Sequence, residues 1–477
     1  MKTKRTKSII YLLFWVIILT GCRSLKDPIQ PEFAVLPSTF NGNSDSTNSA
    51  SLSPKQLFND VQLQSLIDSA LSNNLSLLRS KTTILQLEAD VQEARSNLFP
   101  KAGAFLGYSN RKFGLHTMDG AGNITTQIGD GELIPIHLND FNFGIQTSWE
   151  IDVWGKLKEQ KKAALARYAA AVETQNMLKT WIVEQVVINY FNLISLDETK
   201  RIIQRNIILN QEMVEVLNAQ KEAGKTTELS IQQFEALSLN YANELLTIEQ
   251  EINFTENELR KLTANYEGEI KRSNFQNNAI LTIQVDAGIP SQLLANRPDV
   301  RQAEQELVAS KADLVVARKM FYPSLTINGS LGFQAYKTRF LFASPESIAY
   351  GLFGNLMAPV INMGALKAHF KRASALQVDA IYACQETILN AYTEVNNGLY
   401  AIQNTTQMLE NKSQEVSKLK EARNISGELF NASRADYLEV LFSQQNALES
   451  ELEFMDLNKK QFLWKVYLYK ALGGGWR

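Results

Sequence analysis

Apolar residues follow two different periods along this chain, and the change from one to the other predicts where helices give way to strands. Before Pro323 they recur at helical spacing, back through Leu314 and Leu307. After Pro323 the period falls to two: one side carries Leu325, Ile327, Leu331 and Phe333, and the other carries Thr326, Asn328, Ser330 and Gln334. Proline cannot continue a helical hydrogen-bond ladder and disfavours helical geometry in the residue before it. The pattern therefore predicts a helix that ends, and a strand that begins, near Pro323.

The chain contains this plan twice. Pro323 follows Pro100 by 223 residues, and Gly364 follows Gly155 by 209 residues. Offsets that stay constant over such lengths indicate an internal duplication. Each copy is predicted to contain a helix, a strand, a loop, a second strand, a very long helix, a turn and a final helix. The expected fold class is therefore α+β, with the copies at residues 54–286 and 287–477.

Four strands are expected, at about residues 99–111, 138–152, 322–336 and 347–362. Alternation is clearest in the second, where Phe141, Phe143 and Ile145 alternate with polar residues. An alternating strand of this length fits either a half-buried sheet or an outer-membrane strand, and the strand alone does not decide between them. Open sheet edges are not tolerated in lipid, and known membrane barrels have at least eight strands. If these strands enter a membrane, several copies of the chain must share one barrel.

The helical patterns are unusually long. Almost no helix breaker occurs between Gly155 and Gly224, a stretch of about 65 residues or roughly 100 Å. A second long helix is expected from Ala365 to about Ser426, and a helical pattern also runs from Leu57 to Leu98. Helices of this length are typical of coiled coils or helical tubes.

The N-terminus has the composition of a secretion signal. Basic residues at positions 2, 4, 5 and 7 precede an apolar run, Ser8–Thr20, that is too short to span a bilayer comfortably. The run ends in Leu-Thr-Gly before Cys22, which is similar to a bacterial lipobox. We expect residues 1–21 to be removed and Cys22 to carry a covalent lipid, with an ordinary signal peptide as the alternative. Residues 22–53, rich in Pro, Ser, Asn and Thr, are expected to form an extended arm.

The composition argues against several function classes. The 48 basic and 50 acidic residues nearly balance, so no electrostatic footprint for nucleic acid is present. None of the three histidines is spaced like a metal-ligand pair, the nine methionines are scattered, and no common catalytic motif occurs. We therefore expect a protein that is not an enzyme and that has no cofactor apart from the lipid on Cys22.

Four segments resemble signatures of one family, the TolC-like outer-membrane efflux lipoproteins. Residues 293–301, LLANRPDVR, look like its LLxxRPDVR signature, and residues 321–326, FYPSLT, are similar to its FFPSLT. Residues 436–441, DYLEVL, resemble its DYLEVL, and residues 468–476 resemble its closing LYKALGGGW. Together with the lipobox and the duplication, the resemblance covers nearly the whole mature chain.

The resemblance implies a homotrimer with a twelve-stranded transmembrane β-barrel, continued by a long α-helical coiled-coil barrel. It implies a lipid-anchored protein of the outer membrane of a Gram-negative bacterium, extending into the periplasm. The implied function is a passive, gated conduit of a tripartite pump, receiving small molecules from a periplasmic adaptor protein and an inner-membrane efflux transporter. Two alternatives remain open: an exit channel for type I protein secretion, and a coiled-coil envelope scaffold that is not a channel.

The resemblance also implies site residues. A periplasmic gate or adaptor contact would lie in the turns at Ala223–Glu228 and Ala432–Glu439, and the matching positions are Gly224, Thr227, Glu228, Ser433, Arg434, Asp436 and Glu439. The family has an acid where this chain has Phe442, so an acidic ring would rest on Glu439. Alternatively, these charges only cap a helix. The signature residues Arg297, Pro298, Asp299 and Pro323 are expected to be structural, with Asn296 capping a helix that begins at Pro298.

Overall fold

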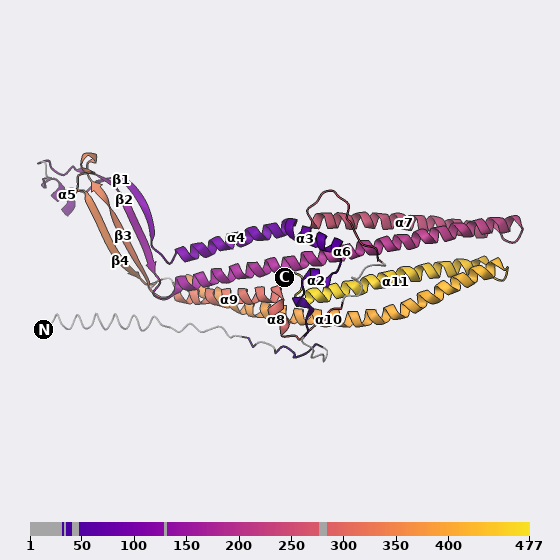
Figure 1. The fold of residues 1–477 in the computed structure, drawn as a ribbon. Coiled ribbons are helices and arrows are strands. Elements are labelled where there is room, and N and C mark those ends of the chain that lie inside the picture. The colour runs from indigo at the N-terminus through magenta and orange to yellow at the C-terminus, as the bar shows by residue number, and fades with distance from the viewer. Residues whose placement is uncertain are drawn as a thin grey trace. The chain divides into compact units, whose positions relative to one another are not determined.

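The computed structural model describes residues 31–32, 35–40, 47–127, 131–275, 284–359, 361 and 363–477 (Figure 1). The predicted signal peptide and Cys22 lie outside these residues. Two compact units can be distinguished. The strand unit is built from Leu87–Tyr168 and Glu306–Tyr382, and the helix unit from Glu32–Gln86, Ala169–Gln305 and Ala383–Arg477. Each unit therefore draws on both copies of the duplicated sequence.

The strand unit contains one antiparallel sheet in which the strands follow their sequence order. Its members are β1 (Lys101–Lys112), β2 (His137–Ile151), β3 (Ser324–Ala335) and β4 (Ile348–Met357). Two short helices, α5 (Met118–Asn123) and η4 (Thr338–Phe340), lie in the connections. Since β1 and β4 pair on one side only, each leaves a row of backbone groups without a strand partner in the sheet.

The register of the sheet separates an apolar face from a polar one. Directly opposed residues share a face in an antiparallel pair. Leu331 lies opposite Ile145 on one side and Tyr350 on the other. Its neighbour Ser330 lies opposite Gln146 and Gly351, on the reverse face. The alternation predicted for residues 325–334 therefore extends across β2, β3 and β4.

Indole groups satisfy backbone carbonyls where the helices of the strand unit meet its strands. Trp149 Nε1 donates to the Leu98 carbonyl at 3.0 Å, and Trp154 Nε1 donates to the Pro323 carbonyl at 2.7 Å. A proline or a helix end leaves carbonyls without a backbone partner. The two tryptophans therefore close the hydrogen bonding near the helix-to-strand junction of each copy.

Long helices make up most of the remaining structure. They are α4 (Leu75–Ser96), α6 (Lys156–Glu222), α7 (Glu228–Leu262), α9 (Pro298–Lys319), α10 (Gly364–Asn431) and α11 (Tyr437–Ala471). Shorter ones are η1 (Ser49–Ser51), α2 (Pro54–Leu57), α3 (Val61–Asn73) and α8 (Gln292–Asn296). The very long helices predicted from the sequence are thus present. In the described part of the chain, no helix has both the length and the apolarity to cross a membrane.

The single helical pattern predicted from Leu57 to Leu98 is wrong, because polar side chains interrupt it twice. Asp60 Oδ1 accepts hydrogen bonds from the backbone N–H groups of Gln62 and Leu63, at 2.8 and 3.1 Å. Asn74 Oδ1 does the same for the second and third residues after it, at 3.0 and 3.2 Å. Such side-chain caps let a new helix begin, so α2, α3 and α4 are separate elements.

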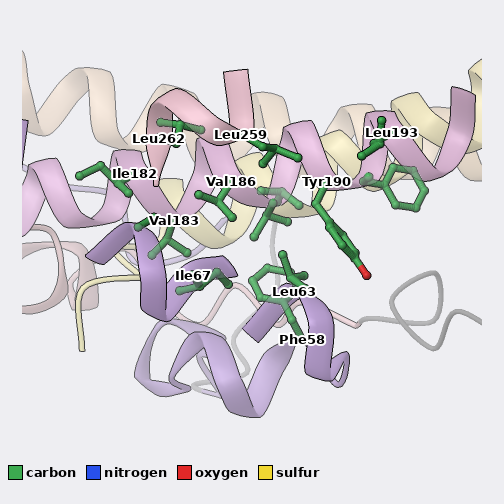
Figure 2. Packing of buried hydrophobic residues seen from close by; sticks show 14 of the residues in the cluster. Phe58, Leu63, Ile67, Ile182, Val183, Val186, Tyr190, Leu193, Leu259 and Leu262 are labelled. Atoms are coloured by element: carbon green, nitrogen blue, oxygen red, sulfur yellow. The ribbon is translucent and has the colours of Figure 1, made fainter. Parts of the chain in front are cut away.

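The largest apolar core of the helix unit joins the short N-terminal helices to the long ones. Figure 2 shows Phe58, Leu63 and Ile67 against Val183 and Val186 of α6, with side chains of α7 nearby. The cluster includes Leu259 and Leu262 of α7 as well. These residues are at most 6% exposed, so the core holds α3, α6 and α7 together by burying apolar surface.

A buried tyrosine completes this core. Tyr190 Oη donates to Asp60 Oδ2 at 2.9 Å and accepts from the backbone N–H of Ser273 at 3.1 Å. Burial raises the pKa of Tyr190 to about 12, so the phenol stays protonated and remains a donor at neutral pH. The connection after α7 is thereby fixed to the same capping carboxylate that starts α3.

Candidate functional site: the two hairpin turns

The turn between α6 and α7 is closed by a residue in the left-handed conformation. Gly224 has φ +71°, a backbone region in which glycine carries no steric penalty. Its N–H donates to the Lys221 carbonyl at 2.9 Å, and the Lys225 N–H donates to the Gln220 carbonyl at 2.8 Å. These two bonds satisfy carbonyls that the end of a helix leaves free.

The turn between α10 and α11 repeats this geometry with a different residue. Ser433 has φ +54°. Its N–H donates to the Phe430 carbonyl at 2.9 Å, and the Arg434 N–H donates to the Leu429 carbonyl at 2.7 Å. Each of these residues lies 209 positions after its counterpart in the first turn, so the duplication extends to individual hydrogen bonds.

Two single substitutions, one at each left-handed residue, are expected to change stability in opposite directions. Ser433→Gly should stabilise the protein by about 0.5–1 kcal/mol, because a side chain in the left-handed region is strained. Gly224→Ser should destabilise it by about 1 kcal/mol for the same reason. The midpoint of thermal unfolding measures both, each variant serving as the other's control. Shifts of the same sign would contradict the assignment.

The first turn carries one ion pair, while its exposed Lys225 forms no salt bridge to a described residue. Lys221 and Glu228 form an ion pair across the turn, and Glu228 Oε1 also accepts from Gln232 Nε2 at 2.8 Å. The hydrogen bond from Lys221 lowers the pKa of the Glu228 carboxyl. Thr227, in the N-cap position of α7, accepts at its carbonyl from Ser230 Oγ at 2.6 Å. Gly224, Thr227 and Glu228 therefore lie together in one exposed turn.

The second turn presents charges without ion-pair partners. Arg434, Asp436 and Glu439 are all exposed, and among the residues that the structure describes none of the three forms a salt bridge. Asp436 occupies the N-cap position of α11, but its carboxylate accepts no capping hydrogen bond there. Phe442, one turn further along α11, is 58% exposed. This turn thus offers a cation, two carboxylates and an aromatic ring to whatever meets it.

Apolar packing beneath the turns supports both of them. Phe234 of α7 and Val440 of α11 belong to one buried cluster, together with Leu217 of α6 and Phe430 of α10. The two hairpins, α6–α7 and α10–α11, therefore share a core near their ends.

The RPD signature residues form a buried joint away from the turns. Arg297 is 7% exposed. Its guanidinium donates two hydrogen bonds to the Asp299 carboxylate, at 3.0 and 2.6 Å. It donates a third to Glu394 Oε2, at 2.7 Å. It also donates to the Ala471 carbonyl at 2.7 Å. Burial alone would lower the pKa of Arg297, but the two carboxylates raise it, so it stays charged. One side chain thus connects the start of α9 with α10 and with the end of α11.

Asn296 does not cap the helix that begins at Pro298, so that prediction is wrong. Asn296 is the last residue of α8, and Arg297 stands between the two helices. The Asn296 carbonyl accepts from Trp476 Nε1 at 3.2 Å, so the residue anchors the C-terminal segment instead. Pro323 lies in the strand unit, where its carbonyl accepts the hydrogen bond from Trp154.

A cluster of cations around one buried carboxylate was not identified from the sequence. Glu451 of α11 is 4% exposed and forms an ion pair with Arg205 of α6. Lys420 and Arg423 of α10 approach its other carboxylate oxygen at 3.5 and 3.8 Å. Its partners come from two other helices, and no local pattern marks it. Within the described ranges, no group of three or more His, Cys, Asp or Glu side chains is arranged to hold a metal.

Comparison with known proteins gives one consistent result. The model of a family described as outer membrane efflux protein matches residues 66–265 and 289–474. The pyoverdine export outer membrane protein OpmQ of Pseudomonas aeruginosa is 27% identical over 465 residues, which cover 97% of this chain and 95% of that protein. The "probable outer membrane lipoprotein SilC" of Salmonella typhimurium is 24% identical over 466 residues, 97% of each chain.

Solved structures share the fold. The open state of the MtrE outer membrane channel of Neisseria gonorrhoeae has a TM-score of 0.81 at 24% identity, covering 96% of this chain and 99% of that one. The CmeC outer membrane channel of Campylobacter jejuni has a TM-score of 0.82 at 23% identity, covering 94% and 95%. At these identities the similarity establishes the fold alone, and it confirms the predicted α+β class.

Proposed function

Because the chain belongs to the outer membrane efflux protein family and is an outer-membrane efflux channel, we propose that three copies of it assemble into one conduit. The four-stranded sheet supports a barrel shared by several copies, and the number three is the family's. It has two open edges, β1 and β4, which lipid does not tolerate, and a closed barrel needs at least eight strands. Three sheets joined edge to edge give twelve strands. One apolar face per sheet then meets lipid, and the polar face lines the passage.

The complete pump would contain two further proteins. We propose that a periplasmic adaptor protein and an inner-membrane efflux transporter deliver small molecules to this channel. The family and the relatives are transport channels, so the chain contributes a passage rather than chemistry. Relatives are named for pyoverdine export, solvent efflux and cation efflux, which supports a conduit for chemically different small molecules.

We place the gate, or the adaptor contact, at the second turn. The observation behind this is the set of three exposed charges without ion-pair partners at Arg434, Asp436 and Glu439, whereas the first turn holds the Lys221–Glu228 ion pair and a single unpaired charge, Lys225, among the described residues. In a homotrimer, three copies of Glu439 would form an acidic ring that favours cations. The ring would hold a single acid from each chain, because Phe442 stands at the family's other acidic position.

Conductance in a planar lipid bilayer tests both the channel and the gate. We expect the purified protein to conduct ions, and Glu439→Gln to lower its preference for cations by about twofold or more, because the ring loses its charge. Glu235→Gln, an equally exposed change on α7, is the matched control and should leave selectivity unchanged. A protein that passes no current, even with Glu439 and Arg434 neutralised together, would be an envelope scaffold instead.

We propose that Cys22 carries the lipid anchor. The name of SilC as an outer membrane lipoprotein supports this modification for the group of relatives. Cys22→Ser should abolish incorporation of radiolabelled palmitate, because serine lacks the thiol that would carry the lipid. Cys384→Ser, which changes the buried cysteine of α10, is the control and should leave labelling intact. Labelling that persists in Cys22→Ser would place the lipid elsewhere, and a wild type that takes up no label would indicate an ordinary signal peptide.

A further inference from the structure

A groove in the helix unit has a lining that neither the turns nor the Arg297 joint uses. It lies between α6, α7 and α11 and encloses about 450 Å³. This volume falls within the range of roughly 300–1,000 Å³ that is typical of small-molecule sites. All three walls come from one chain and one compact unit, so the groove exists without any partner.

Much of the groove wall is apolar and deformable. Leu196 of α6, Ile248 of α7 and Leu452 of α11 contribute aliphatic surface. Met455 of α11 lies on the same wall as Leu452 and is 6% exposed. Phe254 of α7 lies at the rim and is 59% exposed. An aromatic face and a thioether both interact favourably with flat organic rings, and the aromatic face also attracts cations.

Two carboxylates of the groove have no cationic partner. Glu244 and Glu251 lie seven residues apart on α7, on one face of that helix. Neither forms a salt bridge to any residue that the structure describes. Asp456, on the opposite wall, differs because Lys459 and Lys460 approach it at 3.2 and 2.6 Å. Burial raises the pKa of Glu244, as is expected for a carboxyl without a compensating charge.

A buried hydroxyl in the groove has unused hydrogen-bonding capacity. Ser195 of α6 lines the groove and is 5% exposed. Its Oγ has no hydrogen-bond partner among the described residues. Buried polar groups in folded proteins almost always have a partner, so an unpaired one needs an explanation. A ligand with N–H donors would satisfy the hydroxyl and the two carboxylates together.

We propose that this groove binds amphipathic organic cations, with the positive, N–H-bearing end toward Glu244, Glu251 and Ser195. The flat apolar body lies against Met455 and the ring of Phe254. The same carboxylates disfavour an apolar anion, since Lys459, the lysine among the lining residues, is paired with Asp456. This activity goes beyond conduction and does not depend on it, because the site is complete in a single chain.

Ethidium is a suitable probe, because it is a permanent aromatic cation with N–H donors and its fluorescence rises in apolar surroundings. We expect saturable binding to the full-length protein in a non-ionic detergent. The double variant Glu244→Gln/Glu251→Gln should weaken binding about tenfold or more, a loss of about 1.4 kcal/mol or more by the standard conversion. Glu258→Gln, the same change outside the groove on α7, is the control and should not alter the affinity.

Ser195→Leu, which fills the groove with an apolar side chain, should also abolish saturation. Equal ethidium affinity of the double variant and the wild type would overturn the proposal. Ethidium binding by the wild type that never saturates would overturn it too, and would fit a groove whose true occupant is a helix of a partner protein. Bilayer conductance of the same preparations distinguishes the groove hypothesis from the channel hypothesis. A double variant that still conducts separates the groove from the channel, and a protein that binds ethidium without conducting would refute the channel alone.

Discussion

Replacing Leu331 with arginine is expected to destabilise the membrane-inserted protein by about 2–4 kcal/mol. Leu331 is the eighth of the twelve residues of β3, and it is 61% exposed on the apolar face of the sheet. Its neighbours across the strands are Ile145 and Tyr350, so no carboxylate is opposite it to pair with a guanidinium. In the proposed barrel, a charge at this position faces hydrocarbon. Unfolding by guanidinium chloride in lipid vesicles measures the loss.

The adjacent residue supplies the matched control. Ser330→Arg places the same side chain on the opposite face, beside Gln146 and Gly351, where the proposed passage contains water. We expect the free energy of unfolding to change by less than about 1 kcal/mol, and the single-channel conductance to fall because the side chain obstructs the passage. Equal destabilisation by both substitutions would contradict the assignment of the faces.

Arg297→Ala is expected to cost about 3 kcal/mol, because it removes a buried cation from an assembled network. The change leaves the Ala471 carbonyl without this donor and the Asp299 and Glu394 carboxylates without their ion-pair partner. Arg297→Lys should lose less, since it keeps the charge but not the planar fork. The midpoint of thermal unfolding, followed by circular dichroism, reports both.

An exposed arginine shows that this cost comes from burial. The side chain of Arg201 is 56% exposed and pairs with Glu198 one helical turn away at 2.5 Å. Arg201→Ala should change stability by less than about 0.5 kcal/mol, as is usual for surface ion pairs. If both arginine variants lowered the unfolding midpoint equally, the joint at Arg297 would not have the role that its contacts indicate.

Features that depend on local periodicity could be predicted from the sequence. The alternation after Pro323 predicted β3, and the lack of helix breakers after Gly155 predicted α6, because both follow from the spacing of neighbouring residues. The constant offset of 209 residues also placed Ser433 on Gly224, and the structure gives the two turns matching hydrogen bonds.

Features that depend on distant partners could not be predicted. Arg297 is separated from Glu394 by 97 residues and from Ala471 by 174, and nothing in the RPD signature names those partners. The prediction of one continuous helix through Asn74 was wrong for a local reason. The helical apolar pattern continues through Asn74, although its side chain accepts hydrogen bonds from the backbone N–H groups that follow. The groove was equally invisible, because its three walls meet only in the folded chain.

The length of α6 has a mechanical consequence. The helix is 67 residues long and begins directly after Gly155, whose φ of +74° lies outside the helical region. At 1.5 Å per residue it is a lever of about 100 Å, so a tilt of about 5° at its first turn displaces its far end by about 9 Å. That displacement exceeds the length of any side chain in the hairpin turn between α6 and α7. Substitutions around Gly155 could therefore act on events at Gly224 without contacting anything there.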